Sequence, residues 1–296
     1  MRSSSLAMGL VLSCAVAAAA PQPDPAKVPF KIIPVAGAVS LLQSPAGNIA
    51  VLAGNDGVVM VDTGYAASEQ PLRAALKQVS DRPLRFVIDT HIHDDHTGGN
   101  AAFQREAPIV AQANVRTRLA AGAKVMNHEV PPAPPAALPQ ITFEDQLTLH
   151  LDGEEIRLIH LPGHTDGDSI VWFTRANVVH LGDLFVTYGL PFIDLDSGGH
   201  VQGMIAANEK VLSLVPADAK VIPGHGPVCT TADVREYVAM LKETSARVAA
   251  GIAQGKTVAQ LQQEKALAGF DKWSHGFLTP EKFIEQLYRD LSAPAP

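Results

Sequence analysis

The chain has 296 residues, of which 47% are hydrophobic and 18% are charged, a composition that excludes an intrinsically disordered protein. Lys and Arg number 23 against 30 for Asp and Glu, a formal net charge of −7. This charge argues against a nucleic acid or an anionic lipid surface as partner, because both are bound through basic surfaces. Two cysteines cannot form a disulfide framework, whereas the 11 histidines are an unusual count that needs an explanation.

Residues 1–20 have the pattern of a secretory signal peptide, which predicts a periplasmic or secreted protein. One arginine precedes a short apolar run that ends in small residues, with cleavage options after Ala17, Ala19 or Ala20. A second processing route is open, because the sequence V-L-S-C that ends at Cys14 loosely resembles a bacterial lipobox and would give a lipid-anchored N-terminus. The apolar run is too short to predict a membrane span.

The rest of the chain is expected to form one domain. Residues 21–28 are rich in proline and predict a flexible lead-in, and residues 29–296 follow as a single domain with C-terminal helices from about residue 231. Cys229 is the cysteine that remains after processing, so no internal disulfide is expected. The sequence does not indicate an oligomeric state.

The first half of this domain is predicted to alternate strands and helices. Short runs rich in Val and Ile, bounded by Gly or Pro, predict strands at Ile32–Val35, Ile49–Ala53, Val58–Asp62, Arg85–Thr90 and Pro108–Ala111. Helices are predicted near Gln70–Ser80, where apolar residues recur at helical spacing, and after Ala111 as far as about Ala120. Five prolines between Pro131 and Pro139 predict a loop that separates two halves of the fold.

The second half is likewise predicted to contain short strands and helices. The predicted strands are Ile141–Leu151, Glu155–Leu161, Ser169–Phe173, Asn177–Leu181 and Lys220–Pro223. The predicted helices are Val201–Leu214, an amphipathic helix through Val234–Ile252, and a last helix through Phe283–Leu291 with Thr279 as N-cap and Pro280 at its first position. Residues 57–64 and 177–184 resemble each other, since both are apolar strands that end near an Asp. Two β-rich halves with helices predict two sheets packed face to face with the helices outside.

A dense group of metal-binding residue types follows the strand that ends near Asp89. Residues 90–99 read T-H-I-H-D-D-H-T-G-G. His91 and His93 are two apart and point the same way in an extended chain, whereas Asp95 and His96 come after the chain begins to turn. Imidazole and carboxylate are ligands that zinc prefers. A polar strand end with exposed histidines is the alternative, but it is a poor account of so dense a cluster.

Three further candidate ligands stand alone, each on a tight loop after an apolar strand. His164 lies in L-P-G-H-T-D-G-D, Asp183 in H-L-G-D-L, and His225 in V-I-P-G-H-G-P. Each by itself is more typical of a residue that caps a turn than of a metal ligand. Together with the cluster they complete two sets of ligands.

These motifs make the chain resemble the metallo-β-lactamase superfamily over roughly Pro29 to Val228. The strand that ends at Asp62, T-H-I-H-D-D-H, the G-H-T loop, the L-G-D turn and the P-G-H-G-P loop occur in the order found in that family. The resemblance implies an α/β fold, a four-layer αββα sandwich of two mixed sheets flanked by helices, with the metal site at one edge. It also implies two zinc ions per chain: His91, His93 and His164 would hold the first, Asp95, His96 and His225 the second, and Asp183 would bridge them.

The other histidines are predicted to lie outside the ligand sets. His128, His150, His200 and His275 are expected to be exposed or to support the site from outside, and His160 and His180 to make buried hydrogen bonds within strands. Asp62 has two open interpretations: it either orients a ligand histidine or caps its own turn.

The ligand set predicts hydrolysis by a hydroxide shared between two metal ions, with Asp95 orienting it and passing on its proton. The expected substrate is a small molecule with a carbonyl ester, lactone, thioester or cyclic amide. Efficient β-lactam turnover is in doubt, because Asp183 stands where the best-known lactamases have Cys, and apolar residues replace the Lys that commonly follows. Tyr188 is a candidate donor to the developing oxyanion, and Phe185, Tyr188 and Phe192 are candidates for an apolar slot, although plain packing also explains them.

Two other functions remain as alternatives. Some relatives of this fold bind iron through the same residues and act as oxidoreductases on sulfur or oxygen, so an iron-dependent oxidoreductase similar to a sulfur dioxygenase is one. A periplasmic metal-binding protein without catalytic activity is the other. Measuring which metal the protein holds distinguishes the iron-dependent oxidoreductase from a zinc hydrolase.

Overall fold

The computed structural model describes residues 24–126 and 128–293. The predicted signal peptide and the Cys14 lipid site lie outside these residues. The strands are β1 (Lys31–Ala36), β2 (Val39–Ser44), β3 (Gly47–Ala53), β4 (Val58–Val61), β5 (Leu84–Ile88), β6 (Ile109–Gln112), β7 (Ala123–Val125), β8 (His128–Val130), β9 (Ile141–Phe143), β10 (Gln146–Leu151), β11 (Glu154–His160), β12 (Ser169–Phe173), β13 (Val178–His180), β14 (Lys220–Ile222) and β15 (Cys229–Thr230). The helices are α1 (Glu69–Val79), α2 (Asp94–Thr97), α3 (Asn100–Phe103), α4 (Ala113–Ala121), α5 (Val201–Leu214), α6 (Thr231–Ala253), α7 (Val258–Gln263) and α8 (Pro280–Ser292).

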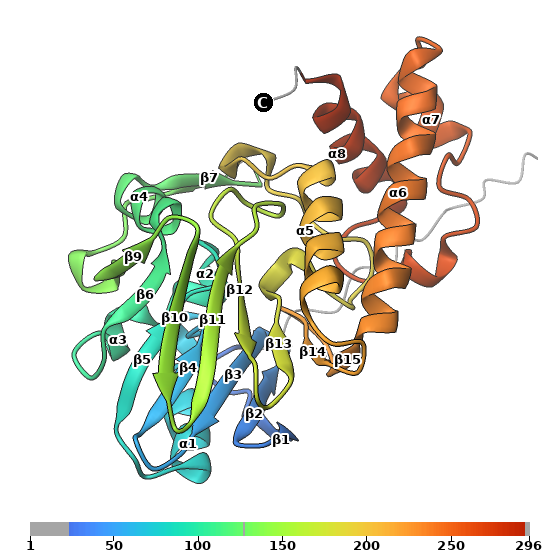
Figure 1. Cartoon of the computed structure of the whole chain (residues 1–296). Helices are drawn as coiled ribbons and strands as arrows, with labels where there is room; N and C mark the ends of the chain where they lie inside the picture. The colour runs from blue at the N-terminus through green and yellow to red at the C-terminus, as the bar shows by residue number, and fades with distance from the viewer. Residues whose placement is uncertain (1–23, 127, 294–296) are drawn as a thin grey trace, which may run out of the picture.

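Most of these strands belong to two mixed sheets of similar construction (Figure 1). The described residues form one sheet in the order β1-β2-β3-β4-β5-β6-β9 and a second in the order β10-β11-β12-β13-β14-β15. In each sheet an antiparallel meander ends in a strand that pairs in parallel with the next one: β4 with β5 across helix α1, and β13 with β14 across helix α5. The two similar segments noted in the sequence, residues 57–64 and 177–184, contain β4 and β13.

One apolar core lies between the two sheets. Leu41, Val61 and Ile88 of the first sheet pack in one cluster with Leu158 and Phe173 of the second. Every residue of β4 is buried, because the other face of its sheet is covered by helices. This explains why the sequence of β4 is an unbroken apolar run and does not alternate apolar with polar residues.

Helices cover the outer face of each sheet, which completes the predicted αββα sandwich. Leu72 of α1 and Phe103 of α3 pack on the first sheet. Met204 of α5, Leu241 of α6 and Phe283 of α8 join the cluster on the second sheet. Helices α5, α6, α7 and α8 gather on the right of Figure 1. None of the helices among the described residues is both long and apolar enough to cross a membrane.

The predicted strand Ile141–Leu151 is wrong as a single element. Its first residues form β9, which pairs in parallel with β6 in the first sheet, and its last residues form β10, which opens the second sheet. The chain therefore crosses between the sheets at residues 144–145. The proline-rich loop 131–139 comes before this crossing and does not separate the halves as predicted. Strand β2 and the hairpin β7–β8 were not predicted from the sequence.

The predicted start of the last helix is confirmed. The Thr279 side chain accepts a hydrogen bond from the backbone N–H of Lys282, and Pro280 occupies the first position of α8. Helix α6 begins with a full capping box in which Thr230 and Asp233 satisfy each other's backbone N–H groups. Both helices belong to the C-terminal segment, which packs on α5 and on the second sheet.

Candidate metal centre

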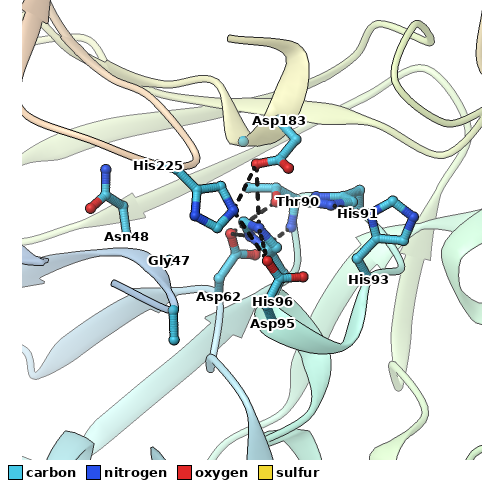
Figure 2. Close-up of polar contacts among 12 residues, drawn as sticks. Gly47, Asn48, Asp62, Thr90, His91, His93, Asp95, His96, Asp183 and His225 are labelled. Atoms are coloured by element: carbon cyan, nitrogen blue, oxygen red, sulfur yellow. Dashed lines mark hydrogen bonds and ion pairs between the residues drawn. The ribbon is translucent and has the colours of Figure 1, made fainter. Parts of the chain in front are cut away.

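The seven predicted ligands come together at one edge of the sandwich, on loops that follow strands. The turn after β5 carries His91 and His93, and helix α2, which begins directly after it, carries Asp95 and His96. The other three ligands follow strands of the second sheet: His164 after β11, Asp183 after β13 and His225 after β14. Figure 2 shows Asp183 and His225 facing His96 and Asp95 across the site.

The facing atoms form two groups. In the first, His93 Nδ1 lies 3.2 Å from His91 Nε2 and 2.9 Å from His164 Nε2. In the second, Asp95 Oδ2 lies 3.1 Å from His225 Nε2 and 3.6 Å from His96 Nε2. Each group offers three ligand atoms close enough together to hold one metal ion.

Asp183 lies between the two groups. Its Oδ1 is 3.4 Å from His96 Nε2 and 3.5 Å from His225 Nε2, on the side of the second group. Its Oδ2 is 3.9 Å from His164 Nε2, on the side of the first. The two oxygens of one carboxylate therefore face different groups, as a bridging ligand requires.

In each buried histidine, the imidazole nitrogen that points away from the site makes a hydrogen bond. These bonds fix which nitrogen faces the site. His93 Nε2 donates to Asp194 Oδ2 at 2.9 Å, and His164 Nδ1 donates to the Phe192 carbonyl at 2.8 Å. His96 Nδ1 donates to Asp62 Oδ2 at 2.7 Å. The proton on the outer nitrogen leaves the inner nitrogen of a neutral imidazole with a free lone pair.

Thr90 extends the same arrangement to His91. The Thr90 hydroxyl donates to Asp62 Oδ2 at 2.9 Å, so its oxygen is left to accept from His91 Nδ1 at 3.0 Å. Asp62 also accepts from the Thr90 backbone N–H at 2.7 Å, which anchors the start of the ligand turn. Asp62 has φ 67, a left-handed conformation that is uncommon for a residue other than Gly. The structure thus favours the first interpretation of Asp62, that it orients a ligand histidine.

The nitrogen and oxygen atoms that converge on the site are suited to bind metal cations. When the imidazoles of His91, His93 and His164 are neutral, their lone pairs point at one another, an arrangement that is repulsive unless a cation or a proton lies among them. His96 Nε2 and Asp183 Oδ1 are buried and have no hydrogen-bond partner in the described residues. Unpaired buried polar atoms are costly, so these two atoms also call for a ligand.

The charges of the groups are consistent with metal ligands. Burial, with His93 nearby, lowers the pKa of His164 to about 4, and burial with the neighbouring imidazoles lowers the pKa of His91 well below its usual value. Burial alone would raise the pKa of Asp183, but His225 and His96 hold it well below the usual range. Neutral imidazoles and an ionised carboxylate are the protonation states that bind metal ions. Neighbouring carboxylates outweigh burial and raise the pKa of His93, His96 and His225, so these three must release any bound proton when a metal ion binds.

The site opens into a cleft of about 1820 Å³. Asp95, Asp183 and His225 line it together with two phenols, Tyr188 and Tyr65. The Tyr188 ring centroid lies 5.3 Å from that of His225, so the structure places this predicted residue beside the ligands. Burial and the nearby aspartates raise the pKa of Tyr188 well above its usual value and that of Tyr65 to about 12. Both phenols remain protonated and can donate hydrogen bonds.

The histidines predicted to lie outside the ligand sets do so. His128, His150 and His275 are exposed, and His180 is buried within 3.3 Å of the Asn48 carbonyl oxygen. His160 is half-buried and bonds the Asp166 carbonyl at 2.9 Å. His200 is also half-buried and accepts from the Gly203 N–H at the start of α5.

Two contributors to the site were missed in the sequence. Asp194 lies in the stretch F-I-D-L-D-S-G-G, which has no metal-binding spacing and no periodicity, so nothing marked it. Tyr65 follows the D-T-G turn directly after β4, and an aromatic residue at the end of a strand beside Asp62 was a signal that could have been used.

An αββα sandwich with two groups of His and Asp ligands at its edge defines a class of metal-binding proteins. The family model of the metallo-beta-lactamase superfamily matches residues 45–225, more than half of the chain. The chain therefore belongs to the metallo-beta-lactamase superfamily.

Relatives with assigned functions are distant. The acyl-coenzyme A thioesterase MBLAC2 of Homo sapiens is 26% identical over 204 residues, which is 60% of this chain and 72% of the relative. The linear primary-alkylsulfatase of Pseudomonas sp. is 22% identical over 274 residues, which is 78% of this chain and 48% of the relative.

Solved structures show the same fold. The stereoselective inverting sec-alkylsulfatase Pisa1 from Pseudomonas sp. superposes with a TM-score of 0.67 at 14% identity, over 88% of this chain and 50% of that chain. The DIM-1 metallo-beta-lactamase gives a TM-score of 0.57 at 20% identity, over 73% of this chain and 99% of that chain.

Proposed function

We propose that this protein is a periplasmic or secreted zinc hydrolase that uses two metal ions to cleave a carbonyl ester, lactone, thioester or cyclic amide in a small molecule. The observation that carries the proposal is the position of Asp183, whose two carboxylate oxygens face two separate groups of histidine and aspartate ligands. Such a pair of groups suits a two-metal site, and hydrolysis is the chemistry for which two-metal sites are commonly used. Membership of the metallo-beta-lactamase superfamily, and relatives named as a thioesterase and an alkylsulfatase, support the same conclusion.

The roles of the ligands follow from their geometry. His91, His93 and His164 would hold one ion and Asp95, His96 and His225 the other, with Asp183 shared. When bound, such ions act as Lewis acids and lower the pKa of water toward neutrality. The chain's own residues supply the orientation, because each buried imidazole is fixed from behind by a hydrogen bond.

Asp95 is placed to handle the proton of the attacking water. Its side chain is 20% exposed toward the cleft, whereas His96 beside it is fully buried, so the carboxylate can be reached by both water and substrate. A carboxylate in this position can take the proton and deliver it to the leaving group. Tyr188 and Tyr65, both protonated, are placed to donate a hydrogen bond to the oxyanion that develops on the substrate.

The surroundings of Asp183 support ester, lactone or thioester substrates over β-lactams. The three residues that follow it, Leu184, Phe185 and Val186, are fully or almost fully buried in the apolar core and offer no cation to a β-lactam carboxylate. Two relatives whose names state an activity, a thioesterase and an alkylsulfatase, also act on ester-type bonds.

A hydrolysis panel tests the proposal. Zinc-loaded protein is offered a chromogenic cephalosporin, an acyl-homoserine lactone, a thioester and an aryl ester, and we expect turnover of at least one acyl substrate. Asp95→Asn is expected to abolish it, with Asp81→Asn, an exposed carboxylate that does not line the cleft, as the matched control. Metal-loaded protein that hydrolyses none of the panel, or iron-loaded protein that consumes oxygen, would contradict the proposal and favour the oxidoreductase.

A further inference from the structure

Exposed apolar side chains gather at the mouth of the metal-site cleft. Among the described residues, the large hydrophobic side chains that are clearly exposed are Met126 at 43%, Val130 at 41%, Ile141 at 37% and Phe277 at 52%. Met126, Val130 and Phe277 line the cleft. Apolar groups concentrated in this way around a cleft mark a site that binds an apolar partner.

Two walls carry these side chains. One is the hairpin β7–β8 with the prolines that follow it, which presents Val125, Met126 and Val130. The other wall is aromatic: the centroid of the Phe277 ring lies 6.3 Å from that of Tyr188 and 6.5 Å from that of Phe192. Phe192 in turn lies 5.9 Å from the ring of His93. The aromatic wall is therefore continuous from a metal ligand to the rim.

Phe277 belongs to a part of the chain outside the matched family region. The loop that carries it is held against the loop after Asp183, where the Leu190 N–H donates to the Trp273 carbonyl at 2.9 Å. The two loops touch through glycines: a Cβ on Gly189 would lie 1.8 Å from the His275 carbonyl oxygen, and one on Gly276 1.7 Å from the Tyr188 carbonyl oxygen. This close backbone contact holds the loop that carries Phe277 against the loop that carries Tyr188 and Phe192, so the fold fixes the aromatic wall in place.

The charges along the cleft disfavour a polyanionic substrate. Bound metal ions would offset the charges of Asp95 and Asp183. The cleft is otherwise lined by the carboxylates of Asp94, Glu129 and Asp24, the last of which pairs with Lys27, against two cations, Lys31 and Arg118. Arg118 is already paired with Asp166, whose Oδ1 accepts from its Nε at 2.7 Å. A substrate with several phosphates, such as a coenzyme A thioester, would find little compensation here.

We propose that the cleft binds the apolar acyl chain of a neutral ester or lactone, with its carbonyl at the metal site and its chain between the β7–β8 hairpin and Phe277. This rests on the proposed hydrolase function and narrows its substrate class. Burial of the chain between the walls supplies binding energy in proportion to its length, because each buried methylene adds to the hydrophobic gain.

A chain-length series tests the substrate class. For acetyl, hexanoyl and decanoyl esters of one phenol, kcat/KM is expected to rise by about two- to fourfold per methylene, until the chain extends beyond the walls. Val130→Ser and Phe277→Ser, one from each wall, are each expected to lower the ratio of decanoyl to acetyl kcat/KM by about tenfold. Ile141→Ser removes the exposed apolar residue that does not line the cleft and is expected to leave this ratio unchanged.

Binding without turnover separates this proposal from the proposed function. Butanol, octanol and dodecanol are used to displace the neutral fluorophore N-phenylnaphthylamine from zinc-loaded protein. Displacement that strengthens with chain length and weakens in Val130→Ser and Phe277→Ser supports the acyl site, even if no ester is hydrolysed. The proposal would be overturned if displacement did not depend on the chain length of the alcohol, or if Ile141→Ser weakened displacement as much as Val130→Ser and Phe277→Ser do. A higher kcat/KM for decanoyl-coenzyme A than for a neutral decanoyl ester would also overturn it.

Discussion

Asp194 illustrates, at the scale of single residues, how much of a metal centre lies outside its motif. Its Oδ2 contacts His93 Nε2 across 101 positions of sequence, and it has no pattern of its own. The meeting of the seven candidate ligands could be predicted, because T-H-I-H-D-D-H places four of them within six residues and three Gly-bounded loops supply the others. Asp62 was among the partners that the sequence suggested, but Asp194 and Phe192 could not be predicted, since they reach the site only through the folding of an irregular loop.

Removing the charge of Asp194 tests its role as an orienting residue. Asp194→Asn is expected to weaken zinc affinity ~10- to 100-fold, because the amide holds the outer proton of His93 less well. Titration with a competing chelator measures the affinity. Asp196→Asn is the matched control, since this exposed neighbour pairs with Arg289 and not with the site. Equal affinities in the two variants would contradict the role of Asp194.

Replacing Asp183 tests the bridging position. Asp183→Ala is expected to lose at least one metal ion per chain and nearly all hydrolysis, because both ligand groups lose a shared carboxylate. Elemental analysis and the ester assay measure the two effects. A fully metallated and active variant would refute the bridge. His128→Ala, an exposed histidine, is expected to keep its metal, and a loss there would overturn the ligand assignment.

At the scale of elements, burial accounts for part of what could be predicted from the sequence, although β2 is mostly buried and was still missed. Strand β4 is an unbroken apolar run and was expected. The hairpin β7–β8 is short and largely exposed, so it has no apolar pattern to detect. The Ile141–Leu151 run contains β9 and β10, which belong to different sheets, and local pattern alone cannot show that a chain changes sheet.

The contact between the loops at Gly189 and Gly276 is testable at the same scale. Gly276→Ala introduces a Cβ against the Tyr188 carbonyl at φ +103, so the loops must separate. We expect a loss of at least ~2 kcal/mol in unfolding free energy and a lower preference for decanoyl over acetyl esters.

Gly269→Ala is the matched control for this variant. Gly269 has a similar positive φ of +91 but nothing within 4 Å of a Cβ, so its replacement is expected to cost only ~1 kcal/mol. Urea unfolding and the ester ratio measure both variants. An equal effect of the two substitutions would mean that the loop contact does not shape the cleft.

At the scale of the whole molecule, the residues of the candidate metal centre come from both halves of the sandwich. His91, His93, Asp95 and His96 follow a strand of the first sheet, whereas His164, Asp183 and His225 follow strands of the second. Metal ions bound between these loops would link the sheets, so folding stability should depend on them.

Chelation tests this dependence. Removing the metal is expected to lower Tm by about 5–10 °C, because the buried lone pairs lose their ligand, and zinc is expected to restore it. Asp183→Ala should show a smaller shift on chelation. Identical Tm values with and without metal, measured by calorimetry, would show that the ions do not link the two sheets.

The central claim is that this cleft is a two-zinc site that hydrolyses a neutral acyl substrate. The most direct measurement is elemental analysis of the purified protein, combined with a decanoyl ester assay and an oxygen electrode on the same sample. The account predicts about two zinc ions per chain, ester hydrolysis and no oxygen uptake. One iron per chain, with oxygen consumed and the ester left intact, would contradict it.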